Sequence, residues 1–230
     1  MALLLAHMES RKLSVKYNTA AEKLTTNAEG QITGLVARSE GWEIQVRARK
    51  AVILACGGFE FDEWTKLQYL ETKPFYAMGS PANTGDGLRM AQAVGARLWH
   101  MWHTHNSYGF KYDGFPMSFR HFIGGSLMTH GALKQVKKMP WIVVDTYGCR
   151  FMNEYPPAPQ DTGARPLPFF DPALPGYPRI PCYLIFDSLG KNTHAIADPM
   201  GYPEHFPGGE RYRWSADNSK EVANGWIMEA

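Results

Sequence analysis

Alternating and continuous apolar runs in the first fifty residues predict a helix followed by a small sheet. Residues 1–12 have the pattern of the end of an amphipathic helix. Short turns, Asn-Ala-Glu-Gly and Glu-Gly, separate the segments that follow and are typical of a β-meander. The predicted strands cover Leu13–Tyr17, Thr19–Leu24, Gln31–Ser39 and Trp42–Arg47.

The next segment, Ala51–Ala55, is an unbroken apolar run, which is the pattern of a strand buried on both faces of a parallel sheet. It ends in Cys56-Gly57-Gly58, and glycine has no Cβ to hold a ligand away from the backbone. Open α/β sheets bind ligands beyond the carboxyl ends of such strands. We therefore predict an α/β fold with the edge of a cofactor site at these glycines.

A second glycine-rich turn, Asn83-Thr84-Gly85-Asp86-Gly87, precedes a predicted helix. Apolar residues recur at helical spacing over 88–94, and Gly95 is expected just past the helix end. Thr84 and Asp86 are favourable capping residues, and a helix N-terminus attracts an anion or an electron-rich group. Because Gly-Asp-Gly is common in turns, a capped surface helix without a ligand is the alternative.

From about His100 the chain becomes rich in aromatic, proline and glycine residues, as expected of an irregular α+β region. Strands over Trp141–Asp145 and Arg150–Asn153 are predicted to form a hairpin. A further strand is predicted over Cys182–Phe186, after an ordered surface loop over Tyr155–Pro181.

Composition and charge narrow the class of partner. The 230 residues are 44% hydrophobic and 20% charged, with a net charge of +2 and no basic stripe. A soluble globular protein with a small-molecule partner is therefore expected, without nucleic-acid or membrane binding. The three cysteines form no CxxC pair, and the apolar residues at the start are too few for a membrane span. A reducing, cytoplasmic location follows as an expectation.

His100, His103 and His105 raise the question of a metal site. No single helix or strand brings all three side chains together, and no carboxylate stands nearby at ligand spacing. We therefore expect packed or hydrogen-bonded histidines and no metal, with a weak histidine metal site as the alternative. Cys56 has no neighbouring His or Lys, so a small buried residue is expected there rather than a nucleophile.

Three motifs together resemble the flavoprotein family of fumarate reductases, succinate dehydrogenase flavoproteins, urocanate reductase and 3-ketosteroid dehydrogenases. They are the segment from Val52 to Phe59, Gly79-Ser80-Pro81, and the turn at Asn83 with the Met90-Ala91 and Gly95-Ala96 pairs that follow it. The resemblance implies FAD as cofactor. It implies a cofactor site formed by Ala21, which would contact the adenine, and by Ala55, Cys56, Gly57, Gly58, Thr84, Gly85, Asp86 and Gly87.

The same resemblance implies two domains and a reaction. Residues 1–99 would be part of an FAD-binding domain, and 100–230 a capping domain on the substrate side, whose last residues could return toward the first domain. The implied reaction is hydride transfer between FAD and substrate that reduces or forms a C=C bond next to an activating group.

Two residues are implied to be catalytic. The segment Arg150-Phe151-Met152-Asn153-Glu154 resembles the family motif R-F-x-N-E, whose glutamate lies near the substrate and, in fumarate reductases, belongs to the proton path. A solvated surface charge is the alternative for Glu154. His105 stands where fumarate reductases have a glutamine, and Ser107 where they have a substrate-contacting histidine. That difference argues against a dicarboxylate substrate but keeps His105 near the substrate as a hydrogen-bond donor.

The chain lacks the G-x-G-x-x-G turn that binds pyrophosphate in this family, and also its glycine-rich carboxy-terminal segment. We therefore expect the sequence to be the middle of a longer protein. A non-catalytic remnant that binds a partner through exposed aromatic residues is the alternative.

Overall fold

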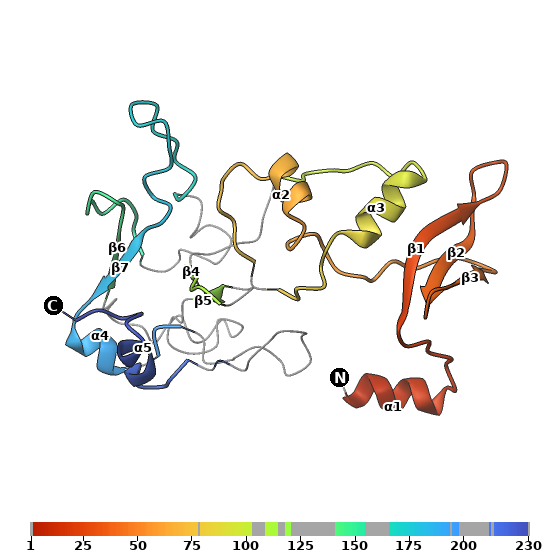
Figure 1. Ribbon diagram of the computed structural model, residues 1–230, viewed down its shortest axis with the longest axis horizontal. Helices are drawn as coiled ribbons and strands as arrows, with labels where there is room; N and C mark the ends of the chain where they lie inside the picture. The colour runs from red at the N-terminus through yellow and green to blue at the C-terminus, as the bar shows by residue number, and fades with distance from the viewer. Residues whose placement is uncertain are drawn as a thin grey trace. The chain divides into compact units, whose positions relative to one another are not determined.

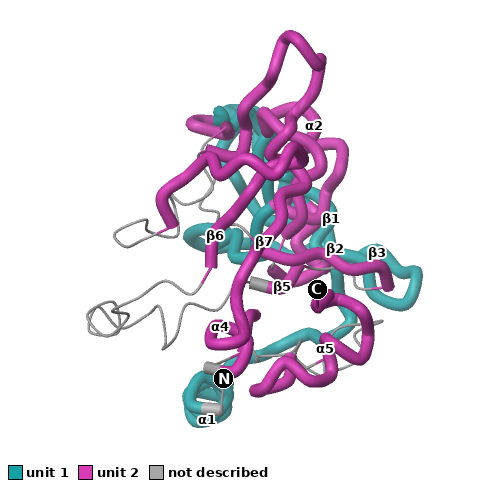
Figure 2. The backbone as a smooth tube through the Cα atoms, turned by 90° about the vertical axis from the view of Figure 1, so that its left-hand side faces the viewer, with its two compact units in different colours: residues 1–58, 85–98 teal, residues 59–84, 99–230 magenta. Residues whose placement is uncertain are grey.

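The computed structural model (Figure 1) describes residues 2–77, 79–102, 109–114, 118–120, 141–154, 166–193, 195–197, 212 and 214–229. The chain forms two compact units, each with its own internal contacts (Figure 2). The first contains Met1–Gly58 and Gly85–Leu98, and the second contains Phe59–Thr84 and Trp99–Ala230. The segment 59–84 thus groups with the later part of the chain, whereas the expected domain division at residue 99 remains a prediction.

The first unit contains the predicted meander. Helix α1 (Ala2–Ser10) precedes an antiparallel sheet of β1 (Thr19–Thr26), β2 (Ile32–Ser39) and β3 (Trp42–Arg47), in that order. Helix α3 (Asp86–Ala93) contacts β1 (Figure 1). The predicted turns are confirmed, because Gly30 and Gly41 have φ values of 79° and 86°, which side chains disfavour. Leu24, Ala37 and Met90 form the buried interior.

Two predicted strands of the first unit are wrong. Neither Leu13–Tyr17 nor Ala51–Ala55 forms a strand, and neither has a ladder partner among the described residues. The apolar run that was expected to be buried is open, with Ile53 87% exposed. A strand exists only through hydrogen bonds to a neighbour, so apolar sequence alone does not produce it.

The second unit is a mixture of short helices and two-stranded sheets. Strand β4 pairs with β5, and β6 pairs with β7, both antiparallel. The elements are α2 (Glu63–Tyr69), β4 (Gly109–Phe110), β5 (Phe119–Arg120), β6 (Trp141–Val144), β7 (Tyr183–Phe186), α4 (Ser188–Thr193) and α5 (Ser219–Ala223). Nowhere in the described part of the chain is a helix both long and apolar enough to cross a membrane.

The predicted hairpin is only partly correct. Its turn is present, because the Asp145 N–H donates to the Cys149 carbonyl at 3.0 Å and Gly148 has a φ of 77°. A single bridge, Val144 to Arg150, follows, and residues 151–153 then leave the ladder. The partner of β6 is instead β7, which is the strand predicted over Cys182–Phe186.

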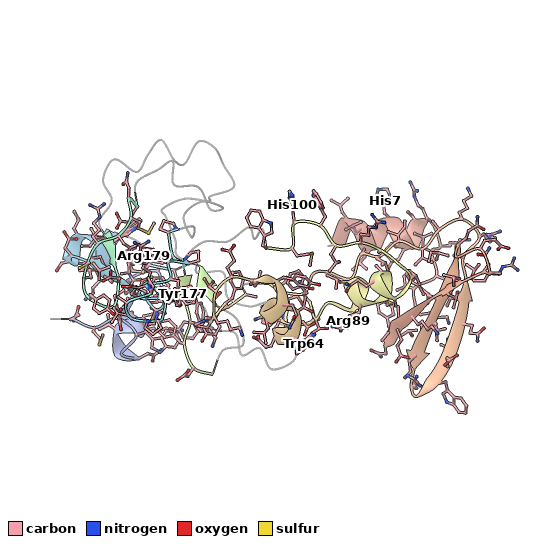
Figure 3. All side chains as sticks on the ribbon, turned by 90° about the horizontal axis from the view of Figure 1, so that it is seen from above. His7, Trp64, Arg89, His100, Tyr177 and Arg179 are labelled. Carbon is pink, nitrogen blue, oxygen red and sulfur yellow. The ribbon has the colours of Figure 1, made fainter. Side chains whose placement is uncertain are left out.

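Residues 166–181 of the expected surface loop are described and are tied down by Arg179 (Figure 3). Its guanidinium carbon lies 4.2 Å from the ring centre of Phe169 and 4.9 Å from that of Phe151. Its Nη1 donates to the Pro166 carbonyl at 2.7 Å. These contacts stabilise the loop against the segment that contains Glu154.

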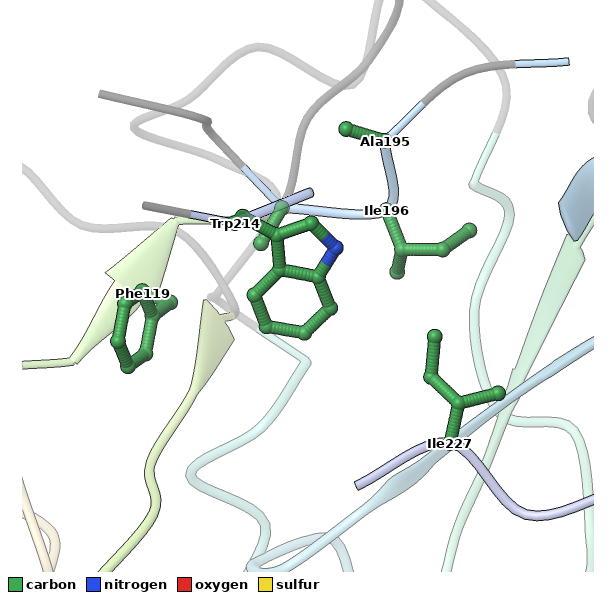
Figure 4. Close-up of a cluster of buried hydrophobic side chains, with 6 residues drawn as sticks. Phe119, Ala195, Ile196, Trp214 and Ile227 are labelled. Atoms are coloured by element: carbon green, nitrogen blue, oxygen red, sulfur yellow. The ribbon is translucent and has the colours of Figure 1, made fainter. Parts of the chain in front are cut away.

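An aromatic core holds the second unit together (Figure 4). Phe119, Trp214 and Ile227 are buried with Ile196, and the ring of Tyr112 stacks on Trp226 at 4.1 Å. Asn218 is fully buried beside them. Its Oδ1 accepts hydrogen bonds from the Ile196 N–H and the Trp214 indole, both at 2.8 Å. A buried side chain that bonds two segments in this way fixes their positions.

Candidate functional site

The glycines Gly57, Gly58, Gly85 and Gly87 of the two turns all belong to the first unit, where the turns meet. The Gly85 N–H donates to the Gly58 carbonyl at 2.9 Å. A Cβ placed on Gly87 would lie 2.5 Å from Cys56 Sγ, well inside contact distance. Glycine at position 87 therefore allows helix α3 to approach the end of the 51–56 segment closely, and a side chain there would push the Cys56 thiol away.

Backbone conformation explains two of the other glycines. Gly57 and Gly85 have φ values of 80° and 81°, in the left-handed region that side chains disfavour. Gly57 and Gly58 are exposed, whereas Gly85 and Gly87 are buried. The peptide groups at 57–58 are therefore open to a ligand, and the glycines at 85 and 87 form the support beneath them.

The start of α3 differs from expectation. Gly85 is the N-cap residue and no side chain caps it, so the prediction that Asp86 caps the helix is wrong. Asp86 is the first helical residue, and its carboxylate pairs with Arg89 at 2.5 Å. Thr84 lies one residue before the cap. The helix end is as predicted, since the Gly95 N–H donates to the Gln92 carbonyl and Gly95 has a φ of 93°.

Ala21 lies on β1 in the same unit and is half-buried. It pairs with Ala37 of β2, and the register shifts between Ala21 and Lys23. A bulge of this kind locally disrupts the ladder and can re-aim backbone groups. The backbone of the predicted adenine strand is thus irregular at the residue that the family resemblance singles out.

Cys56 and Ala55 are both exposed, so the expectation that Cys56 is buried is wrong. The physical reason is that residues 51–55 do not form a strand and that no strand among the described residues pairs with this segment. The Cys56 side chain lies beside Gly87 and occupies the space that a side chain at position 87 would need.

Glu154 belongs to the second unit, and its side chain is 1% exposed. Its Oε1 accepts the Val143 N–H at 2.7 Å, and its Oε2 accepts from Arg150 at 2.5 Å. Burial raises the pKa of Glu154, but the hydrogen bonds from Arg150 and from Val143 outweigh it and hold the pKa below its usual value. The alternative of a solvated surface charge is therefore wrong. The carboxylate occupies the edge of β6 where the returning segment has left the ladder.

Of the three histidines singled out by the sequence, only His100 lies within the described residues. His103 and His105 lie outside the described residues. His100 is exposed, and its ring stacks on Trp99 with 4.7 Å between ring centres (Figure 3). Within the part of the chain that the structure describes, no three His, Cys, Asp or Glu side chains are grouped as metal ligands.

A buried carboxylate that the sequence analysis missed is Glu221, which is fully inaccessible to solvent. It accepts hydrogen bonds from the Tyr212 hydroxyl at 2.5 Å and from the Ser215 N–H at 3.0 Å. Burial and the nearby Glu221 raise the pKa of Tyr112 to about 12. Asn218 and Glu221 have the spacing of a capping box, but Asn218 makes no side-chain cap hydrogen bond to α5, so this pattern does not explain the burial of Glu221.

Comparison with known proteins supports the flavoprotein family that the glycine turns indicated. The model of an FAD binding domain matches residues 1–161. The 3-oxosteroid 1-dehydrogenase of Mycobacterium tuberculosis (strain ATCC 25618 / H37Rv) is 40% identical over 92 residues, which are 36% of this chain and 16% of that protein. The 4-oxocyclohexanecarboxylate 2-dehydrogenase of Sinomonas cyclohexanicum is 29% identical over 216 residues, covering 86% of this chain and 34% of the relative.

A solved structure shows the same fold. It is the 3-ketosteroid delta1-dehydrogenase from Sterolibacterium denitrificans in complex with 1,4-androstadiene-3,17-dione, with a TM-score of 0.69 and 28% sequence identity. The match covers 84% of this chain and 33% of that protein. This chain therefore spans about a third or less of the length of these relatives. Because the family model matches more than half of its residues, the chain belongs to the FAD binding domain family, whose cofactor is FAD.

Proposed function

We propose that this chain supplies one side of the FAD site, together with a substrate-side region, in an oxidoreductase that forms or reduces a C=C bond next to a carbonyl group. The observation that carries the proposal is the contact between the two glycine turns through Gly58 and Gly85. Neither turn is specific by itself. Their contact supports the family resemblance, because a backbone hydrogen bond brings together two motifs that the family shares.

The residues present fit a flavin. A cofactor with a flat ring needs backbone that it can approach closely, and Gly57 and Gly58 are exposed without a Cβ. The N-terminus of α3 has no side-chain cap, so its backbone dipole favours an electron-rich group. Ala21, at the bulge of β1, is proposed to contact the adenine through its backbone. When bound, FAD supplies the hydride acceptor or donor.

The proposed roles of the protein are to orient the substrate, to exclude water and to move a proton. In this proposal residues 100–230 form the capping region, and Glu154 and His105 serve the proton route. The contacts of Glu154 limit that role. Because Arg150 and Val143 keep its carboxylate ionised, it is suited to hold the neighbouring segment in place or to accept a proton, and less suited to donate one at neutral pH.

The names of the relatives indicate the substrate class. They act on a 3-oxosteroid and on 4-oxocyclohexanecarboxylate, which share a ketone in a six-membered ring. We propose a cyclic ketone, or its α,β-unsaturated counterpart, as substrate. The ketone acidifies the neighbouring C–H, so loss of that proton and transfer of a hydride from the next carbon form the C=C bond.

The test is flavin chemistry in protein expressed from the complete reading frame. The purified protein should retain FAD. Under anaerobic conditions, addition of 4-oxocyclohexanecarboxylate or a 3-oxosteroid should reduce the flavin, which is seen as a loss of the absorbance of oxidised flavin. A reductase would instead show reoxidation of chemically reduced flavin by the unsaturated ketone. Cyclohexanol, which lacks the activating carbonyl, is the control. Protein that holds no flavin would favour the alternative of a non-catalytic binding module, and flavin that responds to neither kind of ketone would exclude this substrate class.

A further inference from the structure

The Glu60 carboxylate, in the second unit, contacts residues that lead into the second glycine turn. Glu60 Oε1 accepts a hydrogen bond from Asn83 Nδ2 at 2.5 Å. A Cβ placed on Gly79 would lie 2.5 Å from the same oxygen. The absence of a side chain at position 79 therefore leaves the space that the Glu60 carboxylate occupies.

Asn83 is also held by its backbone. Its carbonyl accepts the Phe61 N–H at 3.1 Å, and its N–H donates to the Ser80 carbonyl at 2.9 Å. The side chain of Glu60 thus adds a charge-assisted hydrogen bond to two backbone bonds at one residue. Three bonds to a single loop residue indicate that its orientation is closely controlled. Asn83 is the first residue of the turn that ends at Gly87.

We propose that Glu60 is a positioning residue for the cofactor turn. Its carboxylate fixes Asn83, and Asn83 in turn sets the direction in which the chain enters Thr84 and Gly85. Gly79 is required because a larger residue would displace the carboxylate. The inference rests on the proposed function, in which this turn faces FAD.

The contacts lead to a specific prediction of non-additivity. Glu60 Oε1 is the end of a flexible side chain, so Gly79→Ala should be accommodated by moving the carboxylate, at the expense of its bond to Asn83. Once Glu60 is truncated to alanine, a methyl group at position 79 has nothing to displace. The two substitutions should therefore act through the same bond, and their effects should not add.

The experiment measures FAD affinity, the flavin spectrum and the flavin reduction potential in the complete protein. Glu60→Ala and Gly79→Ala should each weaken FAD binding by about tenfold, the effect of one charge-assisted hydrogen bond, and should shift the potential in the same direction. The double variant should resemble Glu60→Ala. Glu60→Gln should restore both readouts, because its amide oxygen can still accept from Asn83. Glu63→Ala is the matched control, since that side chain is 85% exposed.

The outcomes are distinct. Unchanged affinity and potential in Glu60→Ala would overturn the inference, as would additive losses in the double variant. If Glu60→Ala fails to fold, the other two variants still test the inference. Glu60→Gln should have the FAD affinity and potential of the wild type, and Gly79→Ala should not. Wild-type protein without flavin would instead contradict the proposed function itself, and this inference with it.

Discussion

At the scale of single residues, glycines in this chain have two different physical functions. Gly85 and Gly95 are required by backbone conformation, since both have a positive φ. Gly79 and Gly87 are required by contact, because a Cβ would meet Glu60 or Cys56. Sequence shows only that a glycine is present, so this distinction comes from the structure.

The two left-handed glycines of α3 provide a matched test of the cofactor turn. Gly85→Ala and Gly95→Ala should each lower the free energy of unfolding by about 1–2 kcal/mol, because alanine is strained at positive φ. They stand at opposite ends of a helix of eight residues, about 12 Å long. In the complete protein, only Gly85→Ala should also reduce FAD retention, by about tenfold or more. Equal FAD retention in the two variants would remove the turn from the cofactor site.

Glu154 and Glu22 provide a second matched pair, because the carboxylate of each is held by hydrogen bonds from a single arginine, Arg150 for Glu154 and Arg38 for Glu22. The Glu22 carboxylate is 41% exposed and that of Glu154 is 1% exposed. Glu154→Ala should destabilise the protein by about 1–3 kcal/mol, since the buried Val143 N–H would lose its acceptor. Glu22→Ala should have a much smaller effect. Chemical denaturation measures both, and equal losses would contradict the structural role of Glu154.

The lowered pKa of Glu154 predicts how stability depends on pH. A carboxylate whose pKa is lower in the folded state stabilises the protein above its unfolded pKa, which is about 4.3 for glutamate. That contribution is lost as the pH falls through the lower, folded-state pKa. The melting temperature of wild type should therefore decline more steeply below about pH 4.3 than that of Glu154→Gln, which does not titrate. Parallel pH profiles would show that the carboxylate is not stabilised by folding.

Turnover separates the two roles of Glu154. A positioning role predicts that Glu154→Gln lowers turnover only as far as it disturbs the fold, with an unchanged pH profile. A proton-route role predicts a larger loss of turnover at normal flavin content, together with loss of one ionisation from the pH profile. Unchanged turnover over a broad pH range would exclude the proton-route role.

At the scale of elements, the meander, whose strands pair with their neighbours along the chain, followed the sequence pattern, whereas the pairing of β6 with the distant β7 did not. The meander from β1 to β3 is held by ladders between consecutive strands. Within it, Gly34 of β2 faces the backbone of β3, and a Cβ there would collide with the Val46 carbonyl oxygen. That backbone cannot move without breaking the ladder.

Gly34→Ala therefore tests the packing of the meander. It should lower the free energy of unfolding by about 2–3 kcal/mol, because a backbone collision is relieved only by shifting a strand. Gly41→Ala, in the turn between β2 and β3, is the control with open space around its Cβ, and should cost about 1 kcal/mol from its positive φ. Far-ultraviolet circular dichroism and denaturant unfolding compare the two. A smaller loss for Gly34→Ala than for Gly41→Ala would contradict the register of β2 and β3.

At the scale of the whole molecule, the 230-residue chain is proposed to contain one part of the FAD site, and its sequence has no G-x-G-x-x-G turn of the kind that holds pyrophosphate. We therefore expect the isolated chain to bind FAD weakly or not at all, because the diphosphate ordinarily gains much of its binding energy at that turn. Titration of FAD followed by gel filtration measures this. A yellow chain that retains stoichiometric flavin would contradict the prediction.

The sequence alone was sufficient for several features that depend on residues close together in the chain. The meander, its turn glycines and the end of α3 at Gly95 depend on short-range hydrogen bonds and on backbone conformations that few residue types adopt. The order and spacing of the glycine motifs likewise indicated the FAD family, and the family match over residues 1–161 confirms it.

Only the tertiary structure decided the features that depend on distant partners. The 51–55 segment has the composition of a buried strand but no described neighbour to pair with, and β6 pairs with β7 although a nearer segment was available. Glu154 is buried because Val143 and Arg150 both approach it, which no local pattern encodes. The contact between the glycine turns is of the same kind. Long-range pairing depends on which surfaces meet, and a linear pattern does not contain that information.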